Sequence, residues 1–137
     1  MNFESAQEIN INSESDIITT RKIVRDVATS LGFGITDVTR IVTTASELTR
    51  NIFIYAGSGI LQLHRIDNGN SPGIELIFKD NGPGITDVEL AMEAGYSTCG
   101  GLGLGLPGSK RLMDEMEIQS EVGKGTVVTV RKWLNKK

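Results

Sequence analysis

Glu47 and Asn51 are the first residues whose types and spacing could do chemistry. They are four residues apart in a stretch with helical periodicity, so they share one face of the predicted helix, away from its apolar stripe. A carboxylate beside a carboxamide on a rigid helix can position a water or a hydroxyl group, and it can hold a hard cation through oxygen. Taken alone, the pair is more simply explained as part of a solvated polar face.

A second candidate is the segment Asp80-Asn81-Gly82-Pro83-Gly84. Gly82 and Gly84 permit a sharp turn and bring backbone amides close to a ligand, while a buried aspartate can accept a hydrogen bond from an exocyclic amine. Asn-Gly and Pro-Gly are also common turn dipeptides, so a turn without a ligand is an equally good explanation. Asp80 is the more informative residue because it ends a strand that is otherwise directed at the core.

The third candidate is a glycine-rich segment with Gly101, Gly103 and Gly105, which precedes a predicted helix carrying Lys110. Alternating glycine and leucine favours a loop that closes over a ligand, and the helix N-terminus after it offers unpaired N–H groups to phosphate. The spacing also satisfies G-x-G-x-x-G, but no strand precedes it, as a dinucleotide-binding fingerprint requires. A P-loop is excluded because Ser109 stands where its lysine should be.

The elements that must position these residues can be read from periodicity and turn signals. We expect an edge strand over 4–11, a helix capped by Ser13 and Asp16 that stops at Gly32, and a second helix from Thr36 whose apolar stripe includes Ile41, Ala45 and Leu48. We then expect strands at 60–66 and 74–79, a short helix at 87–94, a helix continuing to 115, and a hairpin of 117–122 with 126–132. This order predicts an α+β fold with helices on one face of a mainly antiparallel sheet, in a single domain covering 1–137.

Composition excludes several classes of protein. The 137 residues include 14 Lys and Arg against 17 Asp and Glu, a net charge of −3 that argues against nucleic-acid binding. No apolar run approaches the ~20 residues of a membrane span, and the N-terminus does not resemble a signal peptide. The single cysteine, Cys99, and the single histidine, His64, exclude an internal disulfide and zinc sites rich in cysteine or histidine. We therefore expect a cytoplasmic protein without membrane or nucleic-acid partners.

The three segments, in this order and at these separations, resemble the N, G1 and G2 boxes of the GHKL superfamily, which includes gyrase-type ATPases, heat-shock protein 90 and histidine kinases. The resemblance covers nearly the whole chain and implies the Bergerat ATP-binding sandwich. Within the superfamily, the segments 95–98, 101–108 and 110–115 and the ending 121–126 resemble the small bacterial serine/threonine kinases that regulate sigma factors by partner switching, in particular the switch kinases of the stressosome.

The resemblance assigns a role to each matching residue. Glu47 would polarise the acceptor hydroxyl or a water, Asn51 would bind Mg²⁺, and Asp80 would accept from the adenine amine of ATP. The remaining matches are two glycines near the purine, three lid glycines over the phosphates and a threonine that reaches the adenine, namely Gly82, Gly84, Gly101, Gly103, Gly105 and Thr126. Lys110 is a phosphate contact by position only, Arg50 is a weaker candidate, and Cys99 receives no role.

The family resemblance implies ATP-dependent phosphorylation of serine or threonine on a STAS-domain protein, after which the released kinase would activate a PP2C-type phosphatase. An anti-sigma factor that holds a sigma subunit and phosphorylates its antagonist is the alternative, because the same boxes serve both. A nucleotide sensor without transfer activity is less well supported, since such a protein has no chemical need for a base at Glu47.

Overall fold

The computed structural model of the chain describes residues 2–82 and 105–134, which form a five-stranded sheet with helices against it. The strand order is β1-β2-β3-β5-β4, and each pair of neighbours is antiparallel. The elements in chain order are β1 (Asn2–Ile11), α1 (Ser15–Leu31), α2 (Ile35–Asn51), the π-helix η1 (Ile52–Ala56), β2 (Gly59–Asp67), β3 (Pro72–Asp80), α4 (Gly105–Leu112), β4 (Glu115–Glu121) and β5 (Gly125–Trp133). The helix expected at 87–94 lies outside the described residues.

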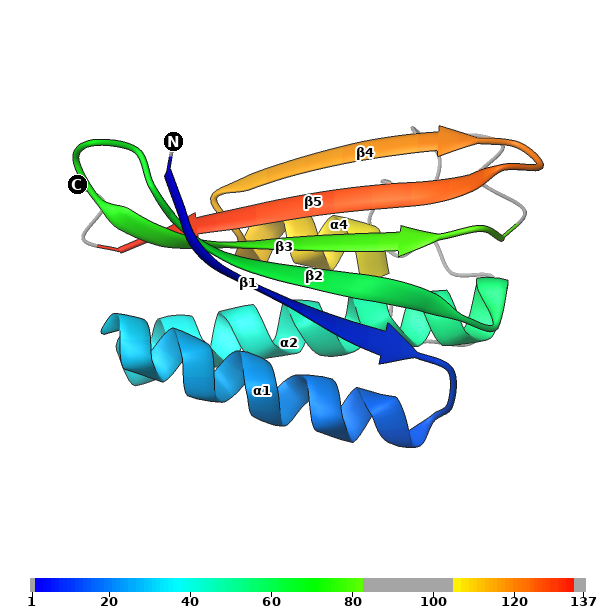
Figure 1. The fold of residues 1–137 in the computed structure, drawn as a ribbon, viewed down its shortest axis with the longest axis horizontal. Helices are drawn as coiled ribbons and strands as arrows, with labels where there is room; N and C mark the ends of the chain where they lie inside the picture. Colours follow the sequence, from blue (N-terminus) through cyan, green and yellow to red (C-terminus); the bar gives the residue numbers. More distant parts are fainter. Residues whose placement is uncertain (1, 83–104, 135–137) are drawn as a thin grey trace.

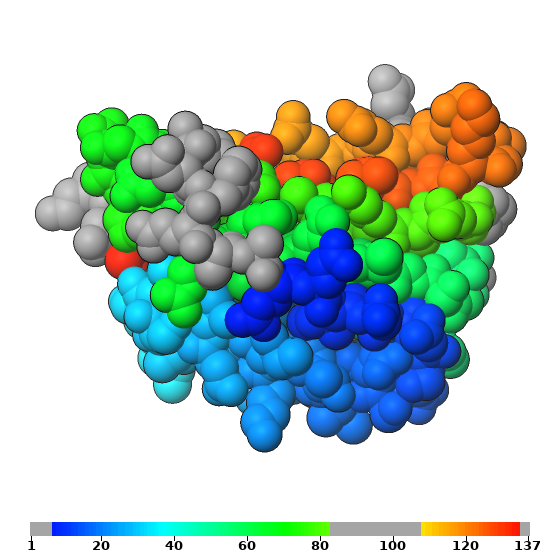
Figure 2. Space-filling view, in the orientation of Figure 1, coloured from blue at the N-terminus to red at the C-terminus, as the bar shows by residue number. Residues whose placement is uncertain are grey.

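The molecule has two layers, with the sheet above α1 and α2 and with α4 packed on the same face (Figure 1). In the space-filling view, α1 in blue and β4 in orange lie at opposite edges of the molecule (Figure 2). The fold is therefore α+β with helices on one face of an antiparallel sheet, as the sequence predicts.

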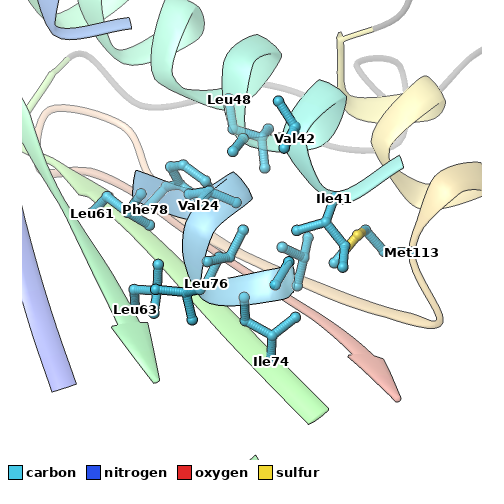
Figure 3. Packing of buried hydrophobic residues seen from close by; sticks show 14 of the residues in the cluster. Val24, Ile41, Val42, Leu48, Leu61, Leu63, Ile74, Leu76, Phe78 and Met113 are labelled. Carbon is cyan, nitrogen blue, oxygen red and sulfur yellow. The ribbon is translucent and has the colours of Figure 1, made fainter. Parts of the chain in front are cut away.

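One hydrophobic core joins the two layers. Strand alternation directs Leu61, Leu76 and Phe78 toward the helices, and the helical repeat of α2 brings Ile41 and Leu48 to meet them (Figure 3). All five side chains are almost fully buried. The apolar stripe predicted for the second helix is confirmed by this packing.

The start of α1 depends on Asp16. Its Oδ2 accepts hydrogen bonds from the backbone N–H of Asn12 at 2.7 Å and of Ser13 at 2.9 Å. These bonds lower the pKa of the Asp16 carboxyl. Of the two bonds of the expected cap, only one is present, because the Asp16 carboxylate accepts from the Ser13 N–H. The Ser13 hydroxyl donates to Asp16 and does not accept from a helical N–H.

We expect Asp16→Ala to lower the melting temperature at pH 7 by a few degrees. Because the pKa of Asp16 is lowered in the folded state, its contribution is present above the ordinary aspartate pKa of about 3.9 and is lost as the pH falls through the folded value. The difference from wild type should therefore disappear in acid, measured by thermal denaturation across pH. Asp26→Ala, at an exposed position of the same helix, is the control. A difference that persisted in acid would contradict this role of the Asp16 charge.

One expectation about local structure is wrong, and one buried charge is found on the outer face of the sheet. The helix predicted to continue to Glu115 ends at Leu112, because the Asp114 N–H donates to the Arg131 carbonyl at 3.0 Å and starts β4 instead. Glu75 lies on the face of β3 opposite to the core residues Ile74 and Leu76, yet it is only 3% exposed. It is buried because it pairs with a cation on the neighbouring strand.

That cation, Arg131, lies on the sheet face away from the helices. Its Nε is 2.7 Å from Glu75 Oε2, and its Nη1 is 3.1 Å from Glu115 and 3.2 Å from Glu117. Burial lowers the pKa of the Arg131 guanidinium, but the hydrogen bonds to Glu75 and Glu115 outweigh it and the pKa is raised. Arg131 is therefore a permanent positive charge that links β3, β5 and β4.

None of the helices formed by residues 2–82 and 105–134 is both long and apolar enough to cross a membrane.

Candidate functional site

Asp80 and Thr126, predicted from separate segments, are direct neighbours in the sheet. Asp80 pairs with Thr126 on β5 and with Gly59 on β2, and Thr126 pairs in turn with Ser120 on β4. We call this row of four residues the Asp80 rung. Side chains two residues apart in a strand share a face, and Asp80 and Thr126 stand at even spacing from core residues of β3 and β5. Their side chains therefore point to the helix side of the sheet.

A hydroxyl pair completes the β4 side of the Asp80 rung. Ser120 Oγ and Thr126 Oγ1 are 2.9 Å apart, and Ser120 Oγ also donates to the Gly125 carbonyl at 3.2 Å. Thr126 is buried, so its hydroxyl is held in one orientation. Sequence reasoning missed Ser120, although the alternation of β4 could have placed it on the same face as Thr126.

The turn after β3 is built around the Asp80 carboxylate. The Gly82 N–H donates to Asp80 Oδ1 at 2.9 Å, which is the local turn that the sequence left open as an alternative. A carboxylate has two oxygens with about four acceptor sites, so this bond fixes the carboxylate without using up its capacity. The turn and a ligand-binding role are therefore compatible.

Three glycines let the elements around the Asp80 rung approach closely. A Cβ on Gly59 would lie 2.5 Å from the Lys79 carbonyl oxygen, and one on Gly82 would lie 2.7 Å from the Ala56 Cβ. Gly125 has φ +118°, and a Cβ there would overlap the Asp80 carbonyl oxygen. Of these three glycines, only Gly82 is among the residues that the sequence predicts for the site.

Glu47 and Asn51 lie on the last turns of α2, and both are partly buried. The π-helix η1 follows Asn51 directly, a distortion often found at functional sites. It brings Ile52 against Gly59 and Ala56 against Gly82. The C-terminal end of α2 thereby lies beside the Asp80 turn, at the end of the sandwich where β3 finishes and β5 begins (Figure 1).

The other predicted residues belong to helices and not to the Asp80 rung, or they lie outside the described residues. Gly105 is the first residue of α4, and Lys110 is exposed on the same helix. Met113, just after α4, packs against Ile41 of α2 (Figure 3), which ties this segment to the helix that carries Glu47. Arg50 is exposed on the last turn of α2. Gly84, Gly101, Gly103 and Cys99 lie outside the described residues.

Across residues 2–82 and 105–134, His, Cys, Asp and Glu form no group of three or more that could hold a metal ion. Asn51, the last residue of α2, carries one side-chain amide oxygen. A single protein oxygen suits Mg²⁺, which commonly takes one or two protein ligands together with substrate phosphates.

Comparison with known proteins finds relatives that match nearly the whole chain. Residues 36–136 match the family described as histidine kinase-, DNA gyrase B-, and HSP90-like ATPase. The chain is 47% identical over 134 residues to the serine/threonine-protein kinase RsbT of Bacillus subtilis, covering 98% of this chain and 99% of that one. It is 32% identical over 141 residues to the anti-sigma F factor of a Thermoanaerobacter species, covering 98% and 97% of the two chains.

Solved structures agree in fold. The crystal structure of the RsbU and RsbW domains of Rv1364c from Mycobacterium tuberculosis superposes with a TM-score of 0.65 at 17% identity, covering 93% of this chain and 32% of that one. The mycobacterial sensor histidine kinase MprB superposes with a TM-score of 0.56 at 18% identity, covering 94% and 97%. The superfamily resemblance inferred from the three boxes is confirmed: the chain belongs to the family of histidine kinase-, DNA gyrase B- and HSP90-like ATPases, among the relatives of RsbT and the anti-sigma F factors.

Proposed function

We propose that this chain is an ATP-dependent serine/threonine protein kinase of the partner-switching type, acting through one nucleotide-binding domain over 1–137. The observation that carries the proposal is the meeting of the Asp80 rung with the end of α2 that holds Glu47 and Asn51. The full-length similarity to RsbT supports the same conclusion.

The Asp80 rung supplies the adenine side of the site. The Asp80 carboxylate accepts a hydrogen bond from the exocyclic amine, which favours adenine over guanine. Thr126, held by Ser120, offers its hydroxyl to the same base. By the family resemblance, Gly82 and Gly84 would leave room for the purine.

The end of α2 supplies the phosphate side. Asn51 would hold Mg²⁺ through its amide oxygen, and the ion would neutralise phosphate charge. When bound, ATP supplies the γ-phosphoryl group that is transferred to the acceptor. Glu47 accepts the proton of the acceptor hydroxyl and orients that oxygen for attack. Lys110 and the amides of Gly101, Gly103 and Gly105 neutralise phosphate charge.

The similarity to RsbT and to the anti-sigma F factors supports a proposal for the partners. We assign as substrate a STAS-domain regulatory protein and as effector a PP2C-type phosphatase, which the kinase binds and activates after phosphorylation releases it. Both belong to a cytoplasmic stress-response pathway. The proposal includes no nucleic-acid or membrane partner.

A second candidate is an anti-sigma factor that sequesters a sigma subunit and phosphorylates an antagonist. The 32% identity to anti-sigma F factors over nearly the whole chain favours it specifically. Isolation of the tagged protein from its own cells distinguishes the two, because a switch kinase is recovered with a phosphatase and an anti-sigma factor with a sigma subunit.

The kinase proposal is tested by incubating the purified protein with ATP labelled in the γ-phosphate and a purified STAS-domain protein. We expect label on the STAS protein, and none after its acceptor serine or threonine is replaced by alanine. Absence of transfer, with ATP still bound, would leave the protein a nucleotide sensor and refute the proposal.

Asp80→Asn tests the base contact. Asparagine can still accept from the Gly82 N–H, but its amide group presents a donor where the adenine amine also donates. The loss of a charge-assisted bond, worth about 1.5–3 kcal/mol, predicts an affinity for ATP lower by about 10- to 100-fold. Calorimetric titration with ATP and GTP measures it.

The matched control is Asp67→Asn. Asp67 makes the same kind of turn at the other end of β2, where its Oδ1 accepts from the Gly69 N–H at 2.6 Å. We expect the control to bind ATP like the wild type. An equal loss of affinity in both variants would mean that the turn, and not contact with the base, explains the effect.

A further inference from the structure

Lys132 of β5 is a buried lysine that the proposed function does not use. Lys132 lies on the same face of β5 as the core residues Val128 and Val130, so its side chain enters the helix layer. The side chain is 8% exposed there. There Nζ donates to the Leu112 carbonyl oxygen at 3.0 Å, and it lies 3.7 Å from Asp114 Oδ1 and 3.8 Å from Asp37 Oδ1. We call these four groups the Lys132 cluster.

The Lys132 cluster holds the C-terminal end of α4. Leu112 is the last residue of that helix, where carbonyl oxygens lack helical partners and a cation is favourable. Asp114 adds two more links to β5, because its N–H donates to the Arg131 carbonyl and its Oδ2 accepts from the Trp133 N–H at 2.9 Å. The end of α4 is therefore tied to β5 by backbone, side chain and charge together.

The same cluster relates α4 to α2. Asp37 belongs to the first turn of α2, whereas Asn51 ends that helix beside the Asp80 turn. From Leu112, α4 extends back toward the end of the sheet where β5 begins (Figure 1). With eight residues it is about 12 Å long and behaves as a short rod. A rod fixed at one end and packed along α2 has a defined position at its other end, which starts at Gly105.

We propose that Lys132 is a positioning residue for phosphate binding: it fixes the Leu112 end of α4 so that the first turn of the helix, which starts at Gly105, is held at the phosphate side of the nucleotide site. This inference rests on the proposed function, because it takes ATP as the ligand. It predicts that the Lys132 cluster affects binding of the phosphates and leaves binding of the adenosine part unchanged.

The test compares two ligands in the full chain by calorimetry: a non-hydrolysable ATP analogue with Mg²⁺, and adenosine. For Lys132→Met we expect the dissociation constant of the ATP analogue to rise about tenfold, the equivalent of one lost hydrogen bond, and that of adenosine to stay within about twofold. Lys132→Arg, which keeps a cationic donor near the Leu112 carbonyl, should recover most of the affinity for the analogue.

Arg131→Met is the matched control. Arg131 is the preceding residue on the same strand and is also largely buried and ion-paired, but it points to the opposite face of the sheet. Its loss should lower stability without changing the ratio of the two dissociation constants. The inference is overturned if Lys132→Met keeps the wild-type ratio, or if Arg131→Met shifts the ratio as much.

Two further measurements keep the test decisive. If Lys132→Met does not fold, Asp114→Asn, which retains an acceptor for the Trp133 N–H, should change the same ratio in the same direction by about two- to threefold; an unchanged ratio overturns the inference. If the wild type binds the ATP analogue no more tightly than adenosine, the proposed function itself fails. This failure is seen in the wild type alone, so it is distinguishable from a failure of the Lys132 inference, which is seen only in the variants.

Discussion

Replacement of Glu47 by glutamine is expected to slow phosphoryl transfer to the proposed STAS-domain substrate by about 10²- to 10⁴-fold, the usual contribution of a general base. Glutamine keeps the size and polarity of the side chain but cannot take the acceptor proton. Glu47 is partly buried on a helix that packs into the core, so the substitution leaves its position unchanged. The affinity for ATP should therefore stay within about threefold of wild type. Single-turnover transfer of labelled phosphate and calorimetry measure the two quantities separately.

Glu121→Gln is the control for this experiment. Glu121 ends β4, and its side chain is exposed and paired only with exposed Lys124 in the described part of the chain. It should transfer phosphate at the wild-type rate. If Glu47→Gln also transferred within tenfold of wild type, another group would accept the proton, and the role of Glu47 would be wrong.

Gly125→Ala is expected to cause the largest loss of stability, more than about 3 kcal/mol in the free energy of unfolding. Gly125 has φ +118°, and its missing Cβ leaves room for the backbone of Asp80 and Asn81. An alanine Cβ would overlap the Asp80 carbonyl oxygen, and a backbone atom cannot move aside as a flexible side chain can. The strand pair that joins Asp80 to Thr126 must therefore separate or shift. Urea denaturation monitored by the fluorescence of Trp133 measures the loss.

Gly123→Ala separates crowding from backbone conformation. Gly123 has φ +82° in the same hairpin, but a Cβ there meets nothing within 4 Å. Its replacement should cost only the strain of a left-handed residue, about 1–2 kcal/mol. Similar losses in the two variants would show that contact with Asp80 adds nothing to the requirement for glycine at 125.

The parts of the fold that sequence predicts are those with local periodic causes. The apolar stripe of α2 and the alternation of β2 and β3 follow from the 3.6- and 2-residue repeats, and Gly32 ends α1 in the left-handed conformation expected of a helix-ending glycine. The Asp80 turn is equally local, because it is made within three residues.

What sequence does not predict depends on partners that are distant in the chain. Asp80 and Thr126 belong to strands whose register is set by the packing of the whole sheet, and their separate motifs do not encode their pairing. The burial of Glu75 depends on Arg131 in the same way. The π-helix after Asn51 has no sequence signal of its own, although it brings the end of α2 to the Asp80 turn. The roles assigned to Glu47, Asn51, Lys110 and the lid glycines remain predictions.

The place of β5 in the sheet has a consequence for the order in which the protein matures. β5 follows the other described strands in the chain, yet it is inserted between β3 and β4, and within residues 2–82 and 105–134 β4 pairs only with β5. During synthesis, a chain whose β5 is still inside the ribosome has Asp80 without Thr126, and α4 without the lysine that holds its end. The pairing of Asp80 with Thr126 and the fixed end of α4 are therefore among the last features that the nascent protein acquires.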